Sequence, residues 1–504
     1  MRLGSRWLRT AVVAGAVLIM QAGIGIAQEK AGALGIFEGQ TDVGVVNPPG
    51  TVKFESGVYT VSAAGANMWS REDAFHFVWK KLSGEDAEIT ADITFGAAQN
   101  PDPHRKAVLI FRQNLDADAV YVDAAQHGSG MTALQYRRER GATTQDIELN
   151  IALPQRLRLE KRGDVFTMFV SNHGEALHPV GASIKLHLEE PFYAGIGVCS
   201  HNKDVVETAA FKDLSLNVGR DDTEAEKAVR YSTLQTIGIE ENFRRAMVVT
   251  TGPERMEAPN WSRDGKTLIF NRDGKIWSIP AEGGTASVVN TGEATKCTGS
   301  HGLSPDGKLL AISCSMPGKP ETRVYIVPTA GGEPKLLTEN PWSYFHGWAP
   351  DGKTIAFTRP DHKGGGNIFA IPVKGGTEKA LTAGSGISDD PDYSADGEWI
   401  YFNSDRGGSM QIWKMRPDGS GAEQVTSDEY GNWTPHPSPD GQSVLILSYP
   451  KGVTGHPTNT DIAFRILNVA DGNIRTVVDV VGGAGSDNTP NWAPDGKHFA
   501  FVSF

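Results

Sequence analysis

The side chains best suited to chemistry stand at fixed distances ahead of a turn that recurs through the C-terminal half. His301 and His346 lie five residues before the turn aspartate, where the other four repeats have proline, and His436 lies four residues before it. Asp389 and Asp390 lie seven and six residues before it. Imidazole and carboxylate groups suit hydrogen bonding to hydroxyls, proton transfer and metal binding. We therefore interpret these five residues as candidate catalytic groups.

Further departures from the repeat widen the set of candidates. Seven residues before the turn aspartate, other copies carry Glu257, Tyr344, Trp433 and Asn488. Tyrosine and tryptophan have flat faces that suit sugar rings. The predicted ligand-binding residues are therefore Glu257, His301, Tyr344, His346, Asp389, Asp390, Trp433, His436 and Asn488. The alternative is that these side chains bind only water and neighbouring backbone.

A divalent metal is a second expectation for the same residues. His301, His346 and His436 could hold Zn²⁺ or Mn²⁺, although no H-E-x-x-H motif or closely spaced histidine pair supports a metal site. Asp389 and Asp390 are adjacent, and neighbouring residues of a strand point to opposite faces. We therefore do not expect this pair alone to supply the two separated carboxylates of glycoside hydrolysis.

Six copies of one repeat position these candidates. Consecutive turn aspartates are 42 to 45 residues apart, except for a last spacing of 55. In each copy Asp-Gly, usually after Pro, forms a tight turn between two apolar strands. Two further strands complete about 45 residues, which is the size of one propeller blade. The turn aspartates are Asp264, Asp306, Asp351, Asp396, Asp440 and Asp495.

Six turns predict six blades around one axis. The sixth repeat reaches Phe504 with only two strands, and residues 232–239 and 245–251 are expected to supply its third and fourth strands. Such closure removes exposed sheet edges. The first strand of each blade would line the axis, so the candidate residues would meet there. His456 and Asp461 lie in the insertion that lengthens the last spacing, and this loop could cover the channel mouth or be an ordinary surface loop.

The repeat resembles that of a known propeller family. Residues 348–357, Trp-Ala-Pro-Asp-Gly-Lys-Thr-Ile-Ala-Phe, and their counterparts resemble the WD40-like (PD40) repeat of the six-bladed TolB-like propeller. The resemblance covers about residues 232–504 and implies a fold more than a function. The N-terminal half differs from that of TolB itself, which argues against a role in the Tol–Pal system. No G-x-S-x-G elbow occurs, so we exclude the serine peptidases that carry such a propeller. Oligogalacturonate lyases, which have a His-rich metal site in a related propeller, are similar in architecture only.

Residues 35–218 contain no repeat and many short β-rich segments. About a dozen such segments predict a two-sheet sandwich. Residues 67–69 and 73–84, followed by 107–112, resemble the concanavalin-like jelly roll of many secreted glycan-active proteins. The resemblance implies either sugar binding or bracing of a neighbouring domain. Residues 219–231 are polar and charged, and we predict a linker there.

The N-terminus has the features of a secretory signal over residues 1–27. Arg2, Arg6 and Arg9 precede an apolar stretch, and Ala27 ends a small-x-small cleavage site. We expect a periplasmic or secreted protein with no transmembrane span in the mature chain; a retained membrane anchor is the alternative. Export permits disulfides, and Cys297 and Cys314 could form one across a hairpin.

Composition and charge narrow the function classes. The net charge is −12 and no basic block occurs, which argues against nucleic acid as a partner. We therefore expect an exported all-β protein, a jelly-roll sandwich followed by a six-bladed propeller. The leading hypothesis is recognition of a glycan or another extracellular polymer at the propeller channel mouth. The alternatives are a carbohydrate hydrolase or lyase, with or without a metal, and an envelope scaffold that binds other proteins.

Overall fold

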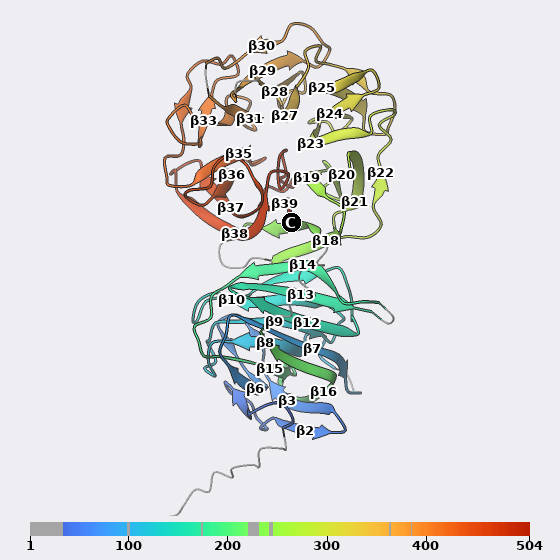
Figure 1. Cartoon of the computed structure of the whole chain (residues 1–504), viewed down its shortest axis with the longest axis vertical. Coiled ribbons are helices and arrows are strands. Elements are labelled where there is room, and N and C mark those ends of the chain that lie inside the picture. The colour runs from blue at the N-terminus through green and yellow to red at the C-terminus, as the bar shows by residue number, and fades with distance from the viewer. Residues whose placement is uncertain are drawn as a thin grey trace, which may run out of the picture.

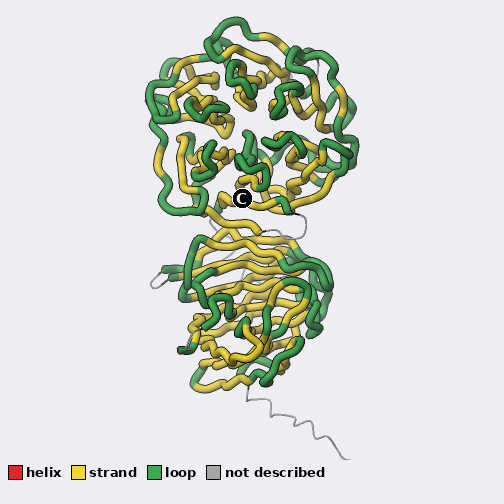
Figure 2. Tube along the Cα trace, turned by 180° about the vertical axis from the view of Figure 1, so that it is seen from behind, coloured by secondary structure: helices red, strands yellow, loops and turns green. Residues whose placement is uncertain are grey.

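The computed structural model describes residues 34–97, 101–172, 175–219, 231–240, 245–361, 364–384 and 386–504. Every regular element in these ranges is a strand, numbered β1 to β39. Figure 1 shows two bodies along the long axis, with the N-terminal half below and the propeller above. Figure 2 shows the same strands and loops from behind. The predicted signal segment 1–27 and most of the predicted linker 219–231 lie outside the described residues.

The N-terminal half is built from two sheets that enclose one core. The alternation of apolar and polar residues in strands such as β12 and β13 places Leu157, Leu159, Phe166 and Met168 in this core and the residues between them toward solvent. The first sheet contains β1 (Gly39–Val43), β6 (Phe75–Leu82), β15 (Phe192–Cys199), β8 (Lys106–Arg112), β9 (Tyr121–His127), β10 (Thr132–Arg137) and β11 (Gln145–Leu149), in that order. The second contains β14 (His178–Lys185), β13 (Val165–Ser171), β12 (Arg156–Arg162), β7 (Asp86–Phe95), β16 (Asn202–Val218), β3 (Val58–Gly65) and β2 (Thr51–Glu55).

A short hairpin lies beside the first sheet and supplies its central buried charge. It consists of β4 (Met68–Trp69) and β5 (Glu72–Asp73). Asp73 accepts hydrogen bonds from Arg112 at 3.2 Å and from Arg137 at 2.8 and 3.0 Å, and none of the three side chains is exposed. This ion cluster holds the hairpin against β8 and β10.

The C-terminal half contains five four-stranded sheets arranged as propeller blades. They are β19 (Met256–Trp261), β20 (Thr267–Arg272), β21 (Lys275–Pro280) and β22 (Ser287–Val288); β23 (Lys296–Leu303), β24 (Leu309–Met316), β25 (Lys319–Pro328) and β26 (Lys335–Leu336); β27 (Tyr344–Trp348), β28 (Thr354–Pro360), β29 (Gly366–Pro372) and β30 (Lys379–Ala380); β31 (Ser388–Tyr393), β32 (Ile400–Ser404), β33 (Gln411–Met415) and β34 (Glu423–Gln424); and β35 (Gly431–Pro437), β36 (Ser443–Tyr449), β37 (Thr458–Asn468) and β38 (Ile474–Gly483).

The repeated turn joins the first two strands of each blade through side-chain hydrogen bonds. In the second blade, Ser304 Oγ donates to Asp306 Oδ1 at 2.7 Å, and the same oxygen accepts the backbone N–H of Lys308 at 3.1 Å. Gly307 has a φ of 70°, a conformation that glycine adopts without strain. The turn is therefore stabilised by residues close in sequence. Because of this, its motif can be recognised from the sequence alone.

The expected sixth blade is not a separate sheet. β39 (His498–Ser503) pairs with β17 (Ser232–Gly238), which pairs with β18 (Arg245–Gly252), and β18 pairs in parallel with β11. These three strands thereby extend the first sheet of the sandwich to ten strands. The predicted six blades thus differ from the five four-stranded sheets that the described residues form. The strands expected to complete the sixth blade do pair with β39, but they belong to the first sheet of the N-terminal half because β18 pairs with β11.

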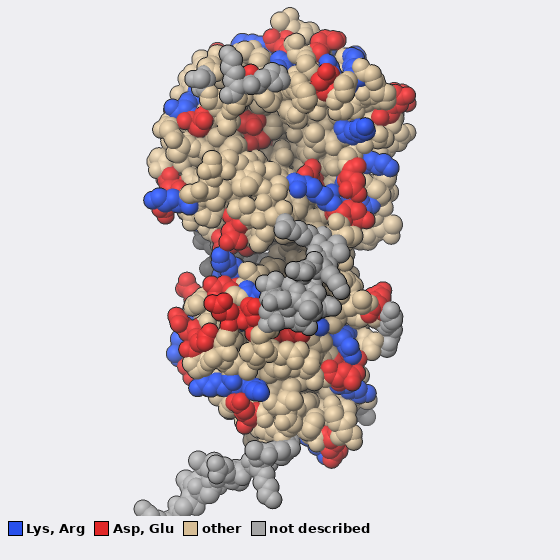
Figure 3. All heavy atoms as spheres, in the orientation of Figure 1, with Lys and Arg blue, Asp and Glu red and all other residues tan. Residues whose placement is uncertain are grey.

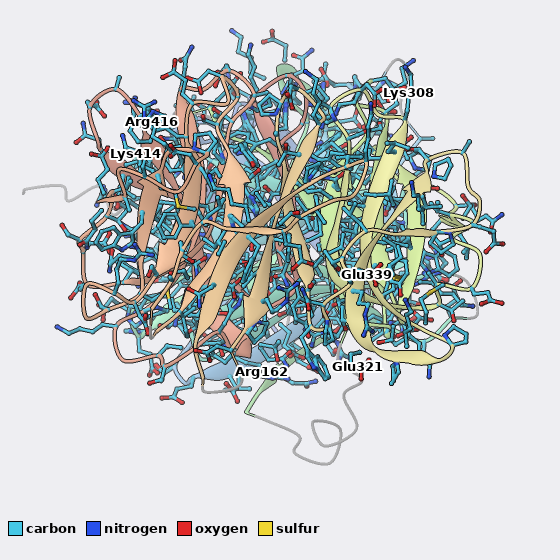
Figure 4. All side chains as sticks on the ribbon, turned by 90° about the horizontal axis from the view of Figure 1, so that it is seen from above. Arg162, Lys308, Glu321, Glu339, Lys414 and Arg416 are labelled. Atoms are coloured by element: carbon cyan, nitrogen blue, oxygen red, sulfur yellow. A yellow bond between two sulfur atoms is a disulfide. The ribbon has the colours of Figure 1, made fainter. Side chains whose placement is uncertain are left out.

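Packing at the surface and between blades uses aromatic rings and cations. Lys414 Nζ lies 4.4 Å and Arg416 Cζ 3.9 Å from the ring centre of Trp399. Lys414 and Arg416 lie together at one edge of the propeller in Figure 4. On the face shown in Figure 3, basic and acidic side chains are interspersed over both halves. Among the described residues, no helix has the length and apolar character needed to span a membrane.

The cysteines lie in two settings. Cys297 on β23 and Cys314 on β24 occupy directly opposed positions and form a disulfide. Cys199 on β15 is a buried free thiol, and burial raises its pKa to about 11. Such a thiol stays protonated and unreactive at neutral pH.

Candidate functional site

The first strands of the blades surround the propeller axis. β19, β23, β27, β31 and β35 lie closest to the centre in Figure 1, and consecutive members of this set contact one another. Each has a register shift against its neighbour shortly before the turn, for example between Asp389 and Asp392 on β31 and between Trp433 and His436 on β35. A β-bulge of this kind re-aims side chains and breaks the strict alternation of a strand.

The bulge on β31 brings two adjacent carboxylates to one histidine. Asp390 has a φ of 50°, in the left-handed region, and its N–H donates to Asp389 Oδ1 at 2.8 Å. His346 Nδ1 lies 3.1 Å from Asp390 Oδ1, and His346 Nε2 lies 3.5 Å from Asp389 Oδ1. The expectation that these aspartates point apart was therefore wrong, because it assumed a regular strand.

The His346 cluster is buried but incompletely hydrogen bonded. The side chains of His346 and Asp390 are each 7% exposed, whereas that of Asp389 is 33% exposed. Asp390 Oδ2 and His346 Nδ1 have no hydrogen-bond partner, so the 3.1 Å contact brings opposite charges together without the alignment of a hydrogen bond. Buried polar atoms without partners are uncommon in proteins and call for an explanation.

Electrostatics couples the three groups. Burial lowers the pKa of His346, but Asp390 and Asp389 together outweigh burial and raise the pKa overall. Burial and the neighbouring charge of Asp390 raise the pKa of Asp389. For Asp390, burial would raise the pKa, but His346 more than compensates and lowers it. The cluster therefore favours an Asp390 carboxylate beside an imidazolium.

His436 forms a second polar centre on the neighbouring strand β35. Its Nε2 lies 2.6 Å from the backbone oxygen of Asp487, and its Nδ1 lies 3.2 Å from Asp392 Oδ2. A carbonyl can only accept, so Nε2 carries a proton. The Nδ1 contact then needs a second proton, either on His436 or on Asp392. Burial lowers the pKa of His436, but its charged neighbours, Asp392 first, raise the pKa overall. Burial raises the pKa of Asp392.

Asp487 completes this centre from the segment between β38 and β39. Its side chain is fully buried and accepts two hydrogen bonds from Thr434 Oγ1, at 3.0 and 3.1 Å. Burial raises the pKa of Asp487 to about 7. An acid with such a pKa can exchange a proton near neutral pH, which is the property of a general acid or base.

The aromatic face predicted at Trp433 is covered. Trp433 is 6% exposed, and the ring of His456 stacks on it with centres 4.7 Å apart and planes 11° from parallel. Tyr449 meets the other side of His456 edge-on at 5.6 Å. The His456 loop, rather than a sugar, therefore occupies this face. His456 Nε2 has no hydrogen-bond partner, and burial lowers its pKa.

The remaining sequence candidates do not join the His346 cluster through any described contact. His301 is fully buried without a hydrogen-bond partner for either ring nitrogen, and burial lowers its pKa to about 4. Glu257 pairs with Arg255, and Asn488 Oδ1 accepts the N–H of Gly485. Tyr344 is half-buried. Because its neutral ring is enclosed, His301 contributes to the interior of its blade.

One set of residues in the described chain could hold a metal ion. Ligand atoms of His346, Asp389 and Asp390 all lie within 4.8 Å of one another. The three histidines predicted as metal ligands, His301, His346 and His436, are not brought together in this way. In the structure, the residues that lie beside His346 are therefore the adjacent aspartates of β31, and not His301 and His436.

Comparison with known proteins decides the family of the C-terminal half. Residues 345–501 match the model of the TolB β-propeller domain, PD40. An uncharacterized protein of Agrobacterium fabrum is 45% identical over 263 residues, which are 52% of this chain and 89% of that protein. The chain belongs to the TolB β-propeller family. A solved structure from Agrobacterium tumefaciens, provisionally named TolB, is 43% identical with a TM-score of 0.52 and covers 54% of this chain and 97% of its own.

A more distant relative of the propeller half carries the name TolB. The Tol-Pal system protein TolB of Francisella tularensis is 24% identical over 283 residues, 53% of this chain and 61% of that protein. The chain thus spans less than two thirds of that relative.

Two site residues of this TolB-type propeller were missed by the repeat analysis. Asp487 lies eight residues before Asp495, one position beyond the four to seven residues from which the candidates were taken. Asp392 lies four residues before Asp396 but was not among the candidates. A carboxylate at a repeat position where no other copy carries one was the available signal.

Proposed function

We propose that this protein is an exported binding protein that recognises a glycan or another hydroxyl-rich extracellular polymer at the axis of its TolB-type propeller. The observation that carries the proposal is the set of buried polar atoms without partners, Asp390 Oδ2, His346 Nδ1 and His456 Nε2. Imidazole nitrogens and carboxylate oxygens bind sugar hydroxyls well, and a ligand would satisfy groups that the fold leaves open. The half-buried Tyr344 supplies an apolar face near the same strand end.

A binding panel tests this function. Oligosaccharides would be screened against the full chain, and hits would be titrated by calorimetry. We expect binding that weakens at least 10-fold in Asp389→Asn, because this carboxylate is the most exposed group of the cluster. Binding should be unchanged in the control Asp118→Asn, a similarly exposed aspartate of the N-terminal half. Absence of binding across the panel, or equal affinity of Asp389→Asn and wild type, would overturn the proposal.

An enzyme is the second candidate, and Asp487 is the observation that favours it. Its raised pKa beside His436 suits proton transfer in a hydrolase or lyase. Mass spectrometry of sugars incubated with the protein separates the cases. Fragments that sum to the parent plus one water indicate hydrolysis, fragments without added water indicate elimination, and intact sugars leave recognition as the function.

The envelope-scaffold alternative rests on a relative's name alone. A protein called TolB of the Tol-Pal system matches the propeller half, which makes binding of envelope proteins a rival function. A scaffold predicts co-purifying proteins and indifference to His436→Gln, whereas a polar axial site predicts lost ligand binding in that variant.

We also infer the finer architecture. β39, β17 and β18 act as a sixth blade, with residues 488–492 as its inner segment; the isolated bridge between Trp492 and Phe499 and the turn at Asp495 support this. The two facing sheets of the N-terminal half support a jelly-roll, concanavalin-like sandwich. Export through the predicted signal segment is consistent with the disulfide.

A further inference from the structure

His346, Asp389 and Asp390 lie close together but do not complete one another's hydrogen bonds. In an N–H···O hydrogen bond the acceptor lies along the N–H direction. Here Asp390 Oδ1 lies 3.1 Å from His346 Nδ1, yet that nitrogen has no hydrogen-bond partner. The oxygen is therefore displaced from the axis of the nitrogen lone pair. The lone pair of this nitrogen is therefore not used by any described group and is open to another partner.

The spacing fits the size of a small divalent cation. Two ligand atoms that each lie about 2.1 Å from one ion are about 3.0 Å apart at a right angle and about 3.4 Å apart at the tetrahedral angle. His346 Nδ1 lies 3.1 Å from Asp390 Oδ1, which is in this range. The 3.5 Å contact with Asp389 Oδ1 is made by the other ring nitrogen, Nε2, so one ion would use only one of these two edges. All three ligand groups come within 4.8 Å of one another. No large rearrangement is needed to bring them to one ion.

An independent observation also points to a bound cation. Asp390 is 5% exposed, and its Oδ2 has no hydrogen-bond partner. The residue holds a left-handed backbone conformation, with φ 50°, that places its carboxylate beside Asp389. The buried carboxylate of Asp390 and the partly exposed one of Asp389 repel each other unless a positive charge lies between them. A single imidazolium offers one charge, whereas a divalent cation offers two.

We propose that His346, Asp389 and Asp390 form a binding site for one divalent transition-metal cation, of the Zn²⁺ or Mn²⁺ class. One imidazole and two carboxylates match the preferences of these ions, whereas Ca²⁺ and Mg²⁺ prefer all-oxygen sites. Three protein ligands leave coordination positions open, and the partly exposed side of the site at Asp389 faces them. His456, whose Nε2 has no hydrogen-bond partner and whose ring interacts electrostatically with Asp390, is a candidate for a further ligand. This site does not depend on the glycan proposal.

The test is direct metal binding by the full chain. Protein stripped with a chelator would be titrated with ZnCl₂, MnCl₂ and CaCl₂ by calorimetry. Co²⁺ would serve as a spectroscopic probe, because its visible absorption reports nitrogen and oxygen ligation. We expect one equivalent of Zn²⁺ or Mn²⁺ to bind, and Ca²⁺ to bind at least 10-fold more weakly.

Variants assign the binding to these residues. His346→Gln and Asp390→Asn are expected to lower the affinity at least 100-fold and to remove the Co²⁺ spectrum. The matched controls His498→Gln and Asp118→Asn alter exposed residues that pair with Asp495 and Arg140, and both should bind like wild type. If the buried variants fail to fold, the partly exposed Asp389→Asn serves in their place, with an expected loss of at least 10-fold.

Three results would overturn the metal site. They are no stoichiometric binding by the wild type, equal binding by Asp389→Asn and wild type, and equal affinity for Ca²⁺ and Zn²⁺. Glycan binding that persists in metal-free protein would support the proposed function without the metal. The metal site is tested separately, by the metal titration. The two proposals therefore fail separately.

Discussion

Asp487 makes the stability of the propeller sensitive to pH at the level of one residue. Its pKa is about 7 in the folded chain and 3.8 ordinarily, so the folded state retains a proton that the unfolded state releases. The unfolding free energy therefore falls as pH rises from about 4 to 7 and levels off above. His436, whose folded pKa is raised, acts in the same direction around its own pKa.

Asp487→Asn should remove much of this pH dependence. The amide keeps an acceptor for Thr434 Oγ1 but cannot ionise. We expect the fall between pH 4 and 7 to shrink by a few kcal/mol, at about 1.4 kcal/mol per pKa unit, and the variant to exceed wild type in stability at pH 8. Urea unfolding at four pH values measures the unfolding free energy of both proteins and hence its pH dependence. Parallel stability curves for the two proteins would contradict the assignment.

Asp73 is the most consequential ion-pair residue of the N-terminal half. Its single negative charge is shared by the two fully buried guanidinium groups of Arg112 and Arg137. Asp73→Asn would leave buried charge uncompensated, and we expect a loss of about 3–5 kcal/mol in unfolding free energy. Denaturant unfolding measures the loss. The exposed pair Arg140–Asp118 provides the control, and Asp118→Asn should leave stability close to wild type. A similar effect of both variants would refute the distinction.

At the scale of strands, the bulge decides which side chains reach the axis. On β31 it gathers Asp389 and Asp390, and on β35 it places Thr434, with a φ of 45°, against Asp487. Asp tolerates the left-handed conformation, but threonine is β-branched and seldom adopts it. Backbone strain of this kind persists where the surrounding structure over-determines it, and it clusters at functional sites.

The disulfide ties the first two strands of the second blade. Cys297 and Cys314 close a loop with a sequence separation of 17. A cross-link of this loop length stabilises by about 3 kcal/mol, chiefly by restricting the unfolded chain. We expect Cys297→Ala/Cys314→Ala to lose about that much in chemical denaturation. A reducing agent should destabilise the wild type and leave the double variant unaffected; sensitivity of both to reductant would point to another cause.

At the scale of the whole molecule, one sheet runs through both halves. The parallel pairing of β11 with β18 is reinforced by Asn150 Nδ2, which donates to the oxygen of Val249 at 2.6 Å, and by the ion pair of Lys185 with Asp461 at 3.0 Å. A groove of about 670 Å³ between β14 and the β37–β38 pair remains open beside this junction. The halves are thus joined by backbone pairing over part of their interface.

This junction should couple the unfolding of the two halves. We expect calorimetry of the full chain to give one main transition. The fragment 231–504 should melt several degrees lower, because β18 loses its neighbour β11 and exposes an edge. Two transitions in the full chain, one of them coinciding with that of the fragment, would show that the pairing carries no coupling.

The sequence by itself determined the repeats, the turn positions and the strand-rich character of both halves. These depend on interactions within a few residues, such as Asp306 with Ser304 and Lys308, so their pattern is local. It also identified His346, Asp389, Asp390 and His436, because they depart from the repeat.

Tertiary structure alone decided how those residues meet. The contacts of Asp487 with His436 and Thr434 span 51 and 53 residues, His456 covers Trp433 by folding back from a loop, and β18 takes its partner from the other half of the chain. None of these follows from local spacing, because contacts between distant segments are set by how whole sheets pack. The bulge at Asp390 likewise cannot be predicted from the two-residue alternation of a regular strand, because one left-handed residue changes the direction of the side chains beside it.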